Sequence, residues 1–216
     1  MKSTLWKVFA SIIALASASI ACATPDISSL LNPLPKDDFS DSSSGWGTGT
    51  DTQSSVEYDN GGLKMTVSQP YYLTWSTPGM DSLENVHIEV SVANTSIDQE
   101  AIFGIICNEQ GTTNNFYYVG VSPDGYYAFY KSHIVGKDDK LKEGKSDVIS
   151  SSSQSMRLGL DCKNGSMTLY VNGQQIDSVS DSDYTSGSMG LFAGSDDQQN
   201  GASVVFDDFV ITKLEK

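Results

Sequence analysis

Residues 155–179 read SMRLGLDCKNGSMTLYVNGQQIDSV, and this segment decides the fold. The pairs Asn164-Gly165 and Asn172-Gly173 are typical of two-residue hairpin turns, because Asn and Gly tolerate the positive φ angles that such turns require. The two turns divide the segment into three antiparallel strands. Apolar and polar residues alternate along these strands, which indicates a sheet with one face in the core and the other in water.

The first hairpin also predicts which side chains share a face, because Lys163 is expected to pair with Ser166. The core side then carries Leu158, Leu160, Cys162, Met167, Leu169, Val171 and Ile176. The solvent side carries Arg157, Gly159, Asp161, Thr168, Tyr170, Gln175 and Asp177.

The same alternation continues outward along the chain, from Asp37 to Ile211, with turn signals at intervals of about 8 to 12 residues. No window favours a helix, so the chain is predicted to be all-β. Two antiparallel sheets of about 12 strands in total would pack face to face as a β-sandwich of the jelly-roll type. We expect one such domain, over residues 37–213.

Residues 1–21 have the pattern of a secretory signal peptide. Lys2 and Lys7 precede an apolar run that ends in small residues and is shorter than the roughly 20 residues needed to span a bilayer. Cleavage before Cys22 would give a lipoprotein with an acylated cysteine, and cleavage after Ala23 would give a secreted protein. Residues 22–36, rich in proline, are predicted to be a tether. The expected location is the cell membrane or cell surface, through a lipid on Cys22.

Charge and cysteine content agree with export. The formal charge of the chain is −14, and removal of residues 1–21 makes it −16. Such a charge disfavours nucleic acid and anionic lipid as partners, so any membrane contact is expected through the N-terminal lipid alone. Cys107 and Cys162 remain as an even pair in a chain directed to an oxidising compartment, and we expect them to form a disulfide.

A second hairpin is predicted around the turn Ser122-Pro123-Asp124-Gly125. If Ser122 pairs with Tyr126, one face of this hairpin belongs in the core, with Tyr117, Val119, Val121, Tyr127 and Phe129. The other face carries Phe116, Tyr118, Gly120, Ser122, Tyr126, Ala128 and Tyr130.

Aromatic rings on that second face suggest a binding surface. Phe116, Tyr118, Tyr126 and Tyr130 would flank a floor formed by the small residues Gly120 and Ala128. Rings beside small residues form a trough in which the apolar face of a sugar stacks while phenolic hydroxyls bind its rim. The alternative is that loops of the protein cover this face. Nearby, Trp75 is expected in the core.

Other chemistry has little support in the sequence. A retaining glycosidase on such a sandwich needs two carboxylates about 5 Å apart, often as Glu-x-Asp-x-Glu, and this string does not occur. His87 and His133 match no zinc or triad spacing and are expected at the surface. No catalytic residue and no cofactor is predicted. Acidic pairs at 37–38, 181/183, 196–197 and 207–208 leave a structural calcium ion open. The charged residues 136–147 are expected to form a solvated hairpin loop.

Three segments carry a resemblance to a known superfamily: DDFSDSSSGW at 37–46, NNFYYVGVSPDGYYAFYK at 114–131 and VVFDDFVITK at 204–213. Over about residues 37–213 the chain resembles the concanavalin A-like lectin and glucanase superfamily. Within it, the chain is similar to laminin G-like and 3-keto-disaccharide hydrolase-like domains of bacterial lipoproteins. The resemblance implies a jelly roll with a ligand-carrying face. The hydrolase-like members tend to carry Asn-Ser-Gly-Ile followed by an arginine, and the nearest segment here is AIFGIICNEQ at 101–110.

Three functions follow from these observations. The first is an exported, lipid-anchored module that binds a glycan or cell-wall polysaccharide. The second is a saccharide-active hydrolase of the 3-keto-disaccharide type, with or without a metal. The third is a structural or protein-interaction domain without a sugar site.

Overall fold

The computed structural model describes residues 34–111, 115–133, 135–195 and 201–215. The predictions for the signal peptide, for Cys22 and for most of the tether lie outside the described residues, as does the acidic pair at 196–197. The first described strand begins at Lys36 and the last ends at Lys213. Among the described residues, no helix is long and apolar enough to cross a membrane.

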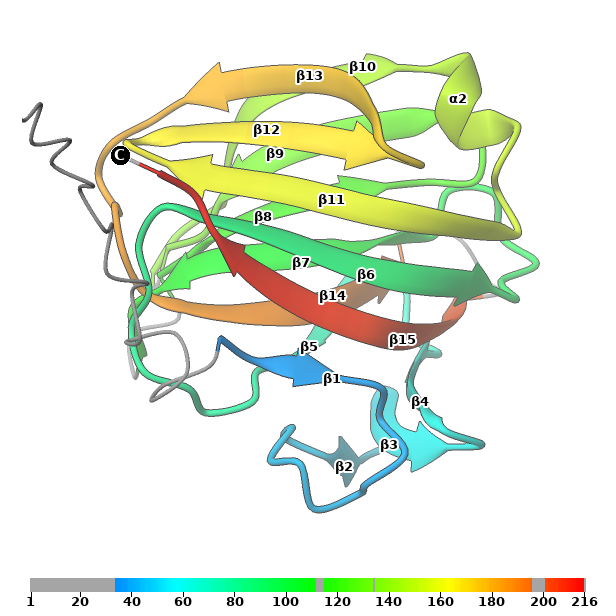
Figure 1. Ribbon diagram of the computed structural model, residues 1–216. Helices are drawn as coiled ribbons and strands as arrows, with labels where there is room; N and C mark the ends of the chain where they lie inside the picture. Colours follow the sequence, from blue (N-terminus) through cyan, green and yellow to red (C-terminus); the bar gives the residue numbers. More distant parts are fainter. Residues whose placement is uncertain (1–33, 112–114, 134, 196–200, 216) are drawn as a thin grey trace, which may run out of the picture. The chain divides into compact units, whose positions relative to one another are not determined.

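The described chain folds into two antiparallel sheets (Figure 1). The nine-stranded sheet contains β13 (Gln174–Ser180), β12 (Ser166–Val171), β11 (Ser155–Lys163), β6 (Val86–Asn94), β15 (Ala202–Lys213), β4 (Gly62–Val67), β3 (Ser54–Asp59) and β2 (Gly49–Thr50) in this order, and β1 (Lys36–Asp37) pairs with β15. The six-stranded sheet contains β10 (Asp139–Lys145), β9 (Tyr126–Lys131), β8 (Tyr117–Val121), β7 (Ile102–Glu109), β14 (Ser188–Ser195) and β5 (Tyr72–Ser76) in this order. The predicted two-sheet antiparallel sandwich is confirmed.

The segment that decided the fold has the predicted register. Lys163 pairs with Ser166, and the pairing continues along β11 and β12 to Leu158 opposite Val171. Asn164 and Asn172, at the turns, have φ angles of +49° and +51°. One position differs: Asp177 lies opposite Leu169, on the core side, because a bulge next to Tyr170 shifts the pairing of β12 with β13.

Residues 136–147 were wrongly predicted to be a loop. Asp139–Lys145 form β10, which pairs with β9 at the edge of the six-stranded sheet, and the short helix α2 (Asp147–Ser150) follows. Most side chains of β10 are exposed, so no apolar alternation marks the strand in the sequence. Ser146 begins the helix because its hydroxyl oxygen accepts a hydrogen bond from the amide of Val148.

The core fills the space between the two sheets. Phe206 and Leu160 of the nine-stranded sheet and Phe103 and Phe129 of the six-stranded sheet are all fully buried there. A disulfide joins Cys107 of β7 to Cys162 of β11, with 6.7 Å between their Cα atoms, and so links the two sheets covalently.

Two of the segments that carry the superfamily resemblance pack against each other. The ring of Trp46 lies edge-on to Phe39 and to Phe209, with centroid distances of 5.3 and 5.0 Å. The indole nitrogen of Trp46 donates a hydrogen bond of 2.9 Å to Asp37. The start of the domain is thereby fastened to its last strand.

Candidate functional site

The hairpin of β8 and β9 has the predicted geometry. The amide of Ser122 donates to the carbonyl of Tyr126 at 2.9 Å, and Gly125 has a φ angle of +92°. Tyr118 lies directly opposite Tyr130. The hairpin therefore presents one set of rings to the core and the other to the outer face of the six-stranded sheet.

The four predicted ligand-binding residues lie together on this outer face, but their exposure differs. Phe116 and Tyr118 are only 3% and 7% exposed, because they belong to a second apolar cluster with Ile106 and Phe192. Tyr126 and Tyr130 remain partly exposed. The first two residues therefore support the surface, and the last two can contact a ligand.

The floor predicted from Gly120 and Ala128 is not open. Both residues are fully covered, and a Cβ atom on Gly120 would lie 2.7 Å from Ile102 and from Phe192. Side chains from β7 and β14 therefore occupy the space above the two small residues. The hollow of this face lies farther out, on top of these side chains.

That hollow is a groove with a volume of about 800 Å³, referred to below as the tyrosine groove. It crosses every strand of the six-stranded sheet, because β5, β14, β7, β8, β9 and β10 each contribute to its lining. Its residues include Tyr71, Tyr72, Leu73, Glu100, Ile102, Tyr118, Ser122, Asp124, Tyr126, Tyr130, Lys137, Asp138, Lys140, Gly194 and Ser195.

Hydrogen bonds and stacking hold the rings of the groove in place. The rings of Tyr118 and Tyr130 stack with a centroid distance of 4.7 Å and an interplanar angle of 10°. The hydroxyl of Tyr118 donates to Asp138 at 2.7 Å, and that of Tyr126 donates to Glu143 at 2.6 Å. These contacts fix the ring orientations before any ligand arrives, which reduces the entropy that binding would cost.

Lys140 completes this wall of the groove. Its ammonium group lies 5.9 Å from the ring centroid of Tyr126 and 6.0 Å from that of Tyr130. It also pairs with Glu143 at 2.7 Å. A cation over an aromatic face is attracted by the negative face of the ring, so this contact further restricts both tyrosines.

Burial and hydrogen bonds shift the pKa values of Tyr126 and Asp124, which line the groove, and of Glu143 beside it. Burial, together with the carboxylate of Glu143, raises the pKa of Tyr126, so its hydroxyl keeps its proton. The hydrogen bond from Lys140 lowers the pKa of Glu143. Burial alone would raise the pKa of Asp124, but hydrogen bonds from Lys145 and from the amide of Tyr126 outweigh it and lower the pKa.

The sequence shows the rings of Tyr71, Tyr72 and Trp75 in and before β5, but alternation did not place them at the groove. Tyr71, just before this strand, is 72% exposed and has a φ angle of +56°, and it lines the groove with Tyr72 and Leu73. The expectation that Trp75 lies in the core is wrong. Trp75 is 39% exposed and pairs with Phe192, which faces outward, so its side chain lies on the outer face of the edge strand. The neighbouring tyrosines could have indicated a position on the aromatic outer face. Alternation alone does not show which face of a strand points away from the core.

The two histidines lie apart, His87 in β6 of the nine-stranded sheet and His133 just after β9 of the six-stranded sheet. His87 contacts Asp161 at 2.6 Å and Glu89 at 3.3 Å on the nine-stranded sheet. His133 follows β9 and contacts Asp139 at 2.9 Å. Within the described ranges, no group of three His, Cys, Asp or Glu residues has the geometry of a metal site.

Acids of two described pairs, at 181/183 and 37–38, make hydrogen bonds and ion pairs within the protein. Asp181 accepts a hydrogen bond from the hydroxyl of Tyr117, and Asp181 and Asp183 both pair with Lys131. Asp37 accepts hydrogen bonds from the amide of Phe39 and from Trp46.

Comparison of the sequence with protein-family models and with curated proteins found no match. Comparison with solved structures found many. The carbohydrate-binding module CBM66 of Bacillus subtilis has a TM-score of 0.61 and 16% identity, over 78% of this chain and 96% of that one. A Bacillus subtilis protein of unknown function with a galectin-like fold has a TM-score of 0.61 and 12% identity, over 83% and 95%.

A third similar structure is the β-glucanase of Bacillus licheniformis, with a TM-score of 0.60 and 13% identity, over 84% of this chain and 98% of that one. Each similarity covers nearly the whole of the other protein. The TM-scores show a shared fold, and at identities this low the comparison shows the fold alone. The fold of this chain is therefore the jelly roll of the concanavalin A-like lectins and glucanases.

Proposed function

We propose that the protein is an exported carbohydrate-binding module and that the tyrosine groove binds a glycan or cell-wall polysaccharide. The observation that carries the proposal is the pair of partly exposed, pre-oriented rings of Tyr126 and Tyr130 in a groove of about 800 Å³. This volume lies within the range of about 300–1,000 Å³ that is usual for ligand sites. The flat apolar face of a sugar ring would stack on a tyrosine, and hydroxyl groups at its edge would meet the polar rim.

The composition of the rim favours an uncharged ligand. Lys137 and Lys140 stand beside Asp124, Asp138 and Glu100, so neither sign of charge prevails in the groove. Serine hydroxyls, carboxylates and ammonium groups together supply both donors and acceptors. A neutral polyol such as a hexose chain can use both, whereas a strongly anionic or cationic ligand would meet repulsion.

The similar structures support the same class of ligand. They include a carbohydrate-binding module and β-glucanases, all of which share this chain's fold. Binding is proposed ahead of hydrolysis because the Glu-x-Asp-x-Glu string that often supplies the two carboxylates of a retaining glycosidase on such a sandwich does not occur in the sequence.

Affinity for a short saccharide is expected to be low. Each sugar–tyrosine stack would contribute about 0.5–1.5 kcal/mol beyond the burial of area. Two stacks contribute about 1–3 kcal/mol. Together with the burial of apolar area and with hydrogen bonds, this gives dissociation constants of roughly high micromolar to millimolar, as expected for a module that binds a polymer through repeated contacts.

Export and lipid attachment form part of the proposal. They rest on the signal pattern of residues 1–21, on Cys22 and on a disulfide that suits an oxidising compartment. After expression in a bacterium that processes lipoproteins, the wild-type protein should be found in the membrane fraction. The variant Cys22→Ser should be found in the soluble exported fraction. If wild type and Cys22→Ser are both soluble and both begin at Thr24, cleavage occurs after Ala23 and the lipid anchor is refuted.

The binding test compares wild type with three variants on a glycan array and by titration. Tyr130→Ala removes a ring that lines the groove and should weaken binding by about tenfold. Tyr130→Phe keeps the stack and should lose less. Tyr170→Ala is the matched control, because Tyr170 is also partly buried but lies on the other sheet, where its hydroxyl donates to Asp161.

Two results would refute the proposal. One is a correctly folded wild-type protein that binds no glycan on the array. The other is equal binding by wild type and Tyr130→Ala. Release of shortened products from a bound saccharide would instead support the hydrolase alternative.

A further inference from the structure

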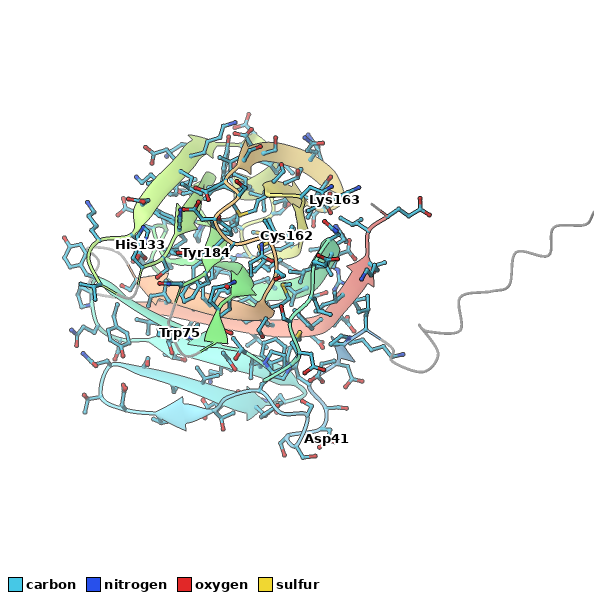
Figure 2. All side chains as sticks on the ribbon, turned by 90° about the vertical axis from the view of Figure 1, so that its left-hand side faces the viewer. Asp41, Trp75, His133, Cys162, Lys163 and Tyr184 are labelled. Atoms are coloured by element: carbon cyan, nitrogen blue, oxygen red, sulfur yellow. A yellow bond between two sulfur atoms is a disulfide. The ribbon has the colours of Figure 1, made fainter. Side chains whose placement is uncertain are left out.

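A second, smaller hollow lies on the outer face of the six-stranded sheet, next to the tyrosine groove. Its volume is about 200 Å³, and it is called the tryptophan hollow below. Trp75, Phe116 and His133 line it together with Leu73, Tyr118 and Asp138. Figure 2 shows Trp75 and His133 on one side of the ribbon, and Lys163 on the other side.

The two hollows share part of their walls. Leu73, Tyr118 and Asp138 line both. Between them, the hydroxyl of Tyr118 donates to Asp138 at 2.7 Å, which ties the chain before β10 down onto the sheet. Because the two hollows share these three residues, a chain molecule that lies over Tyr118 and Asp138 would touch both.

The volumes indicate what each hollow can hold. The groove falls within the range of about 300–1,000 Å³ for ligand pockets, and the tryptophan hollow falls below it. The small hollow is therefore too small for a whole ligand of ordinary size. It can take one unit of a ligand whose remainder lies in the groove.

The chemistry of the tryptophan hollow matches that of the groove. Trp75 is 39% exposed, and its ring lies 5.9 Å from the ring of Phe116, which is buried behind it. The rim is polar, because Ser132, His133 and Asp138 surround the rings. An aromatic face with a polar rim is the arrangement that receives the flat apolar face of a sugar.

We infer that the tryptophan hollow is a second sugar subsite and that the ligand is an oligosaccharide chain which occupies both hollows, not a single terminal sugar. This inference rests on the proposed function of the groove. The groove itself supports it, because it reaches both edges of the sheet. Six strands at spacings of about 4.8 Å give a span of roughly 24 Å, which leaves room for several units of a chain.

The experiment uses the full-length protein and defined oligosaccharides of β-1,3-1,4-glucan, chitin and xylan, from disaccharide to hexasaccharide. For wild type, affinity should rise with chain length. Trp75→Ala should weaken hexasaccharide binding by about three- to tenfold and leave disaccharide binding nearly unchanged. Tyr130→Ala should weaken both.

A second variant guards against a folding defect. Trp75→Phe keeps an aromatic face and should restore most of the hexasaccharide affinity. Among the described residues, the other tryptophan is Trp46, which is 5% exposed. A change in tryptophan emission on hexasaccharide binding should therefore disappear in Trp75→Phe while binding persists.

The outcomes separate the two proposals. If Trp75→Ala binds hexasaccharides as tightly as wild type while Tyr130→Ala does not, the subsite is refuted and the groove stands. If affinity does not depend on chain length, the subsite is refuted as well. If no saccharide binds to the wild type, or if Tyr130→Ala has no effect, the proposed function itself fails.

Discussion

Lys131 has surroundings that are unusual for a lysine. It is only 7% exposed, and a lysine is seldom buried unless it is paired. Asp181 and Asp183, in the segment between β13 and β14, both pair with its ammonium group. The hydroxyl of Tyr117 donates to Asp181 and accepts from the amide of Tyr184. These contacts hold the segment after β13 against β8 and β9.

The electrostatics of Asp181 link this cluster to pH. Burial alone would raise the pKa of Asp181, but the hydroxyl of Tyr117 and the ammonium of Lys131 outweigh it and lower the pKa. In the unfolded chain the pKa of an aspartate is about 3.9. Because the folded value is lower, the stabilisation is fully present above that unfolded value and is lost as pH falls through the folded pKa.

We therefore predict that Asp181→Asn lowers the free energy of unfolding at pH 7 by about 1.5–3 kcal/mol, the usual contribution of a hydrogen bond to a charged group. The difference from wild type should shrink at pH 3. Urea unfolding at both pH values measures it. Glu84→Gln is the control, because Glu84 is exposed and makes no hydrogen bond or ion pair within the described part of the chain. Equal differences at the two pH values would contradict this assignment.

The sequence predicted which face of the hairpin each residue of the groove occupies, but not how exposed its side chain is. Alternation placed Phe116, Tyr118, Tyr126 and Tyr130 together, and the register of β8 and β9 confirmed that arrangement. Their burial depends on Trp75 and Asp138, which come from other parts of the chain. No local pattern contains such long-range contacts, so the sequence could not separate supporting rings from accessible ones.

At the scale of elements, β8 shows how the outer apolar cluster limits substitution. Gly120 lies opposite Gly104 on one side and Ala128 on the other. Ile102 and Phe192 close over it, so that even one added carbon would overlap them. Small residues here therefore serve packing across strands.

We predict that Gly120→Ala destabilises the protein by about 1–3 kcal/mol, the usual cost of an overpacked core. Thermal unfolding followed by circular dichroism measures the change. Gly49→Ala is the matched control, because a Cβ atom at Gly49 on β2 would meet no atom within 4 Å. If both variants unfold at the wild-type temperature, Ile102 and Phe192 can move aside and the packing argument is wrong.

Strands with one buried face and one solvent-exposed face could be predicted from the sequence, whereas the charged edge strand β10 could not. Turn residues and apolar alternation predict the hairpins at Asn164-Gly165 and Asn172-Gly173. β10 pairs on one side only and buries little, so charge dominates its composition. A strand that buries no apolar face shows no alternation of apolar and polar residues in its sequence, so periodicity cannot predict it.

At the scale of the whole molecule, the two-sheet fold was predictable but the strand order was not. Apolar alternation requires a second layer, so a sandwich follows. The placement of β6 between β11 and β15, and of β14 between β7 and β5, joins segments far apart in the sequence. Those pairings depend on the packing of the assembled core.

The disulfide makes a prediction at this scale. Cys107 and Cys162 are 55 residues apart, and a cross-link over such a loop stabilises the folded state by roughly 4 kcal/mol in the chain-entropy account. Reduction should lower the unfolding temperature of wild type. The double variant Cys107→Ala/Cys162→Ala should be less stable and insensitive to reductant. An unfolding temperature that reductant leaves unchanged, with both thiols shown to be free, would contradict the prediction.

The lysines of β10 have a consequence for how copies of this molecule meet. Lys140, Lys142 and Lys145 lie along the outermost strand of the six-stranded sheet, and a register shift between Lys140 and Lys142 breaks its straight run. Lys142 also reaches across to Asp177 on the neighbouring layer. An incoming polypeptide that tried to extend the sheet by one more strand would meet a row of charged side chains and an irregular row of backbone groups, so we expect this border to resist fibre growth.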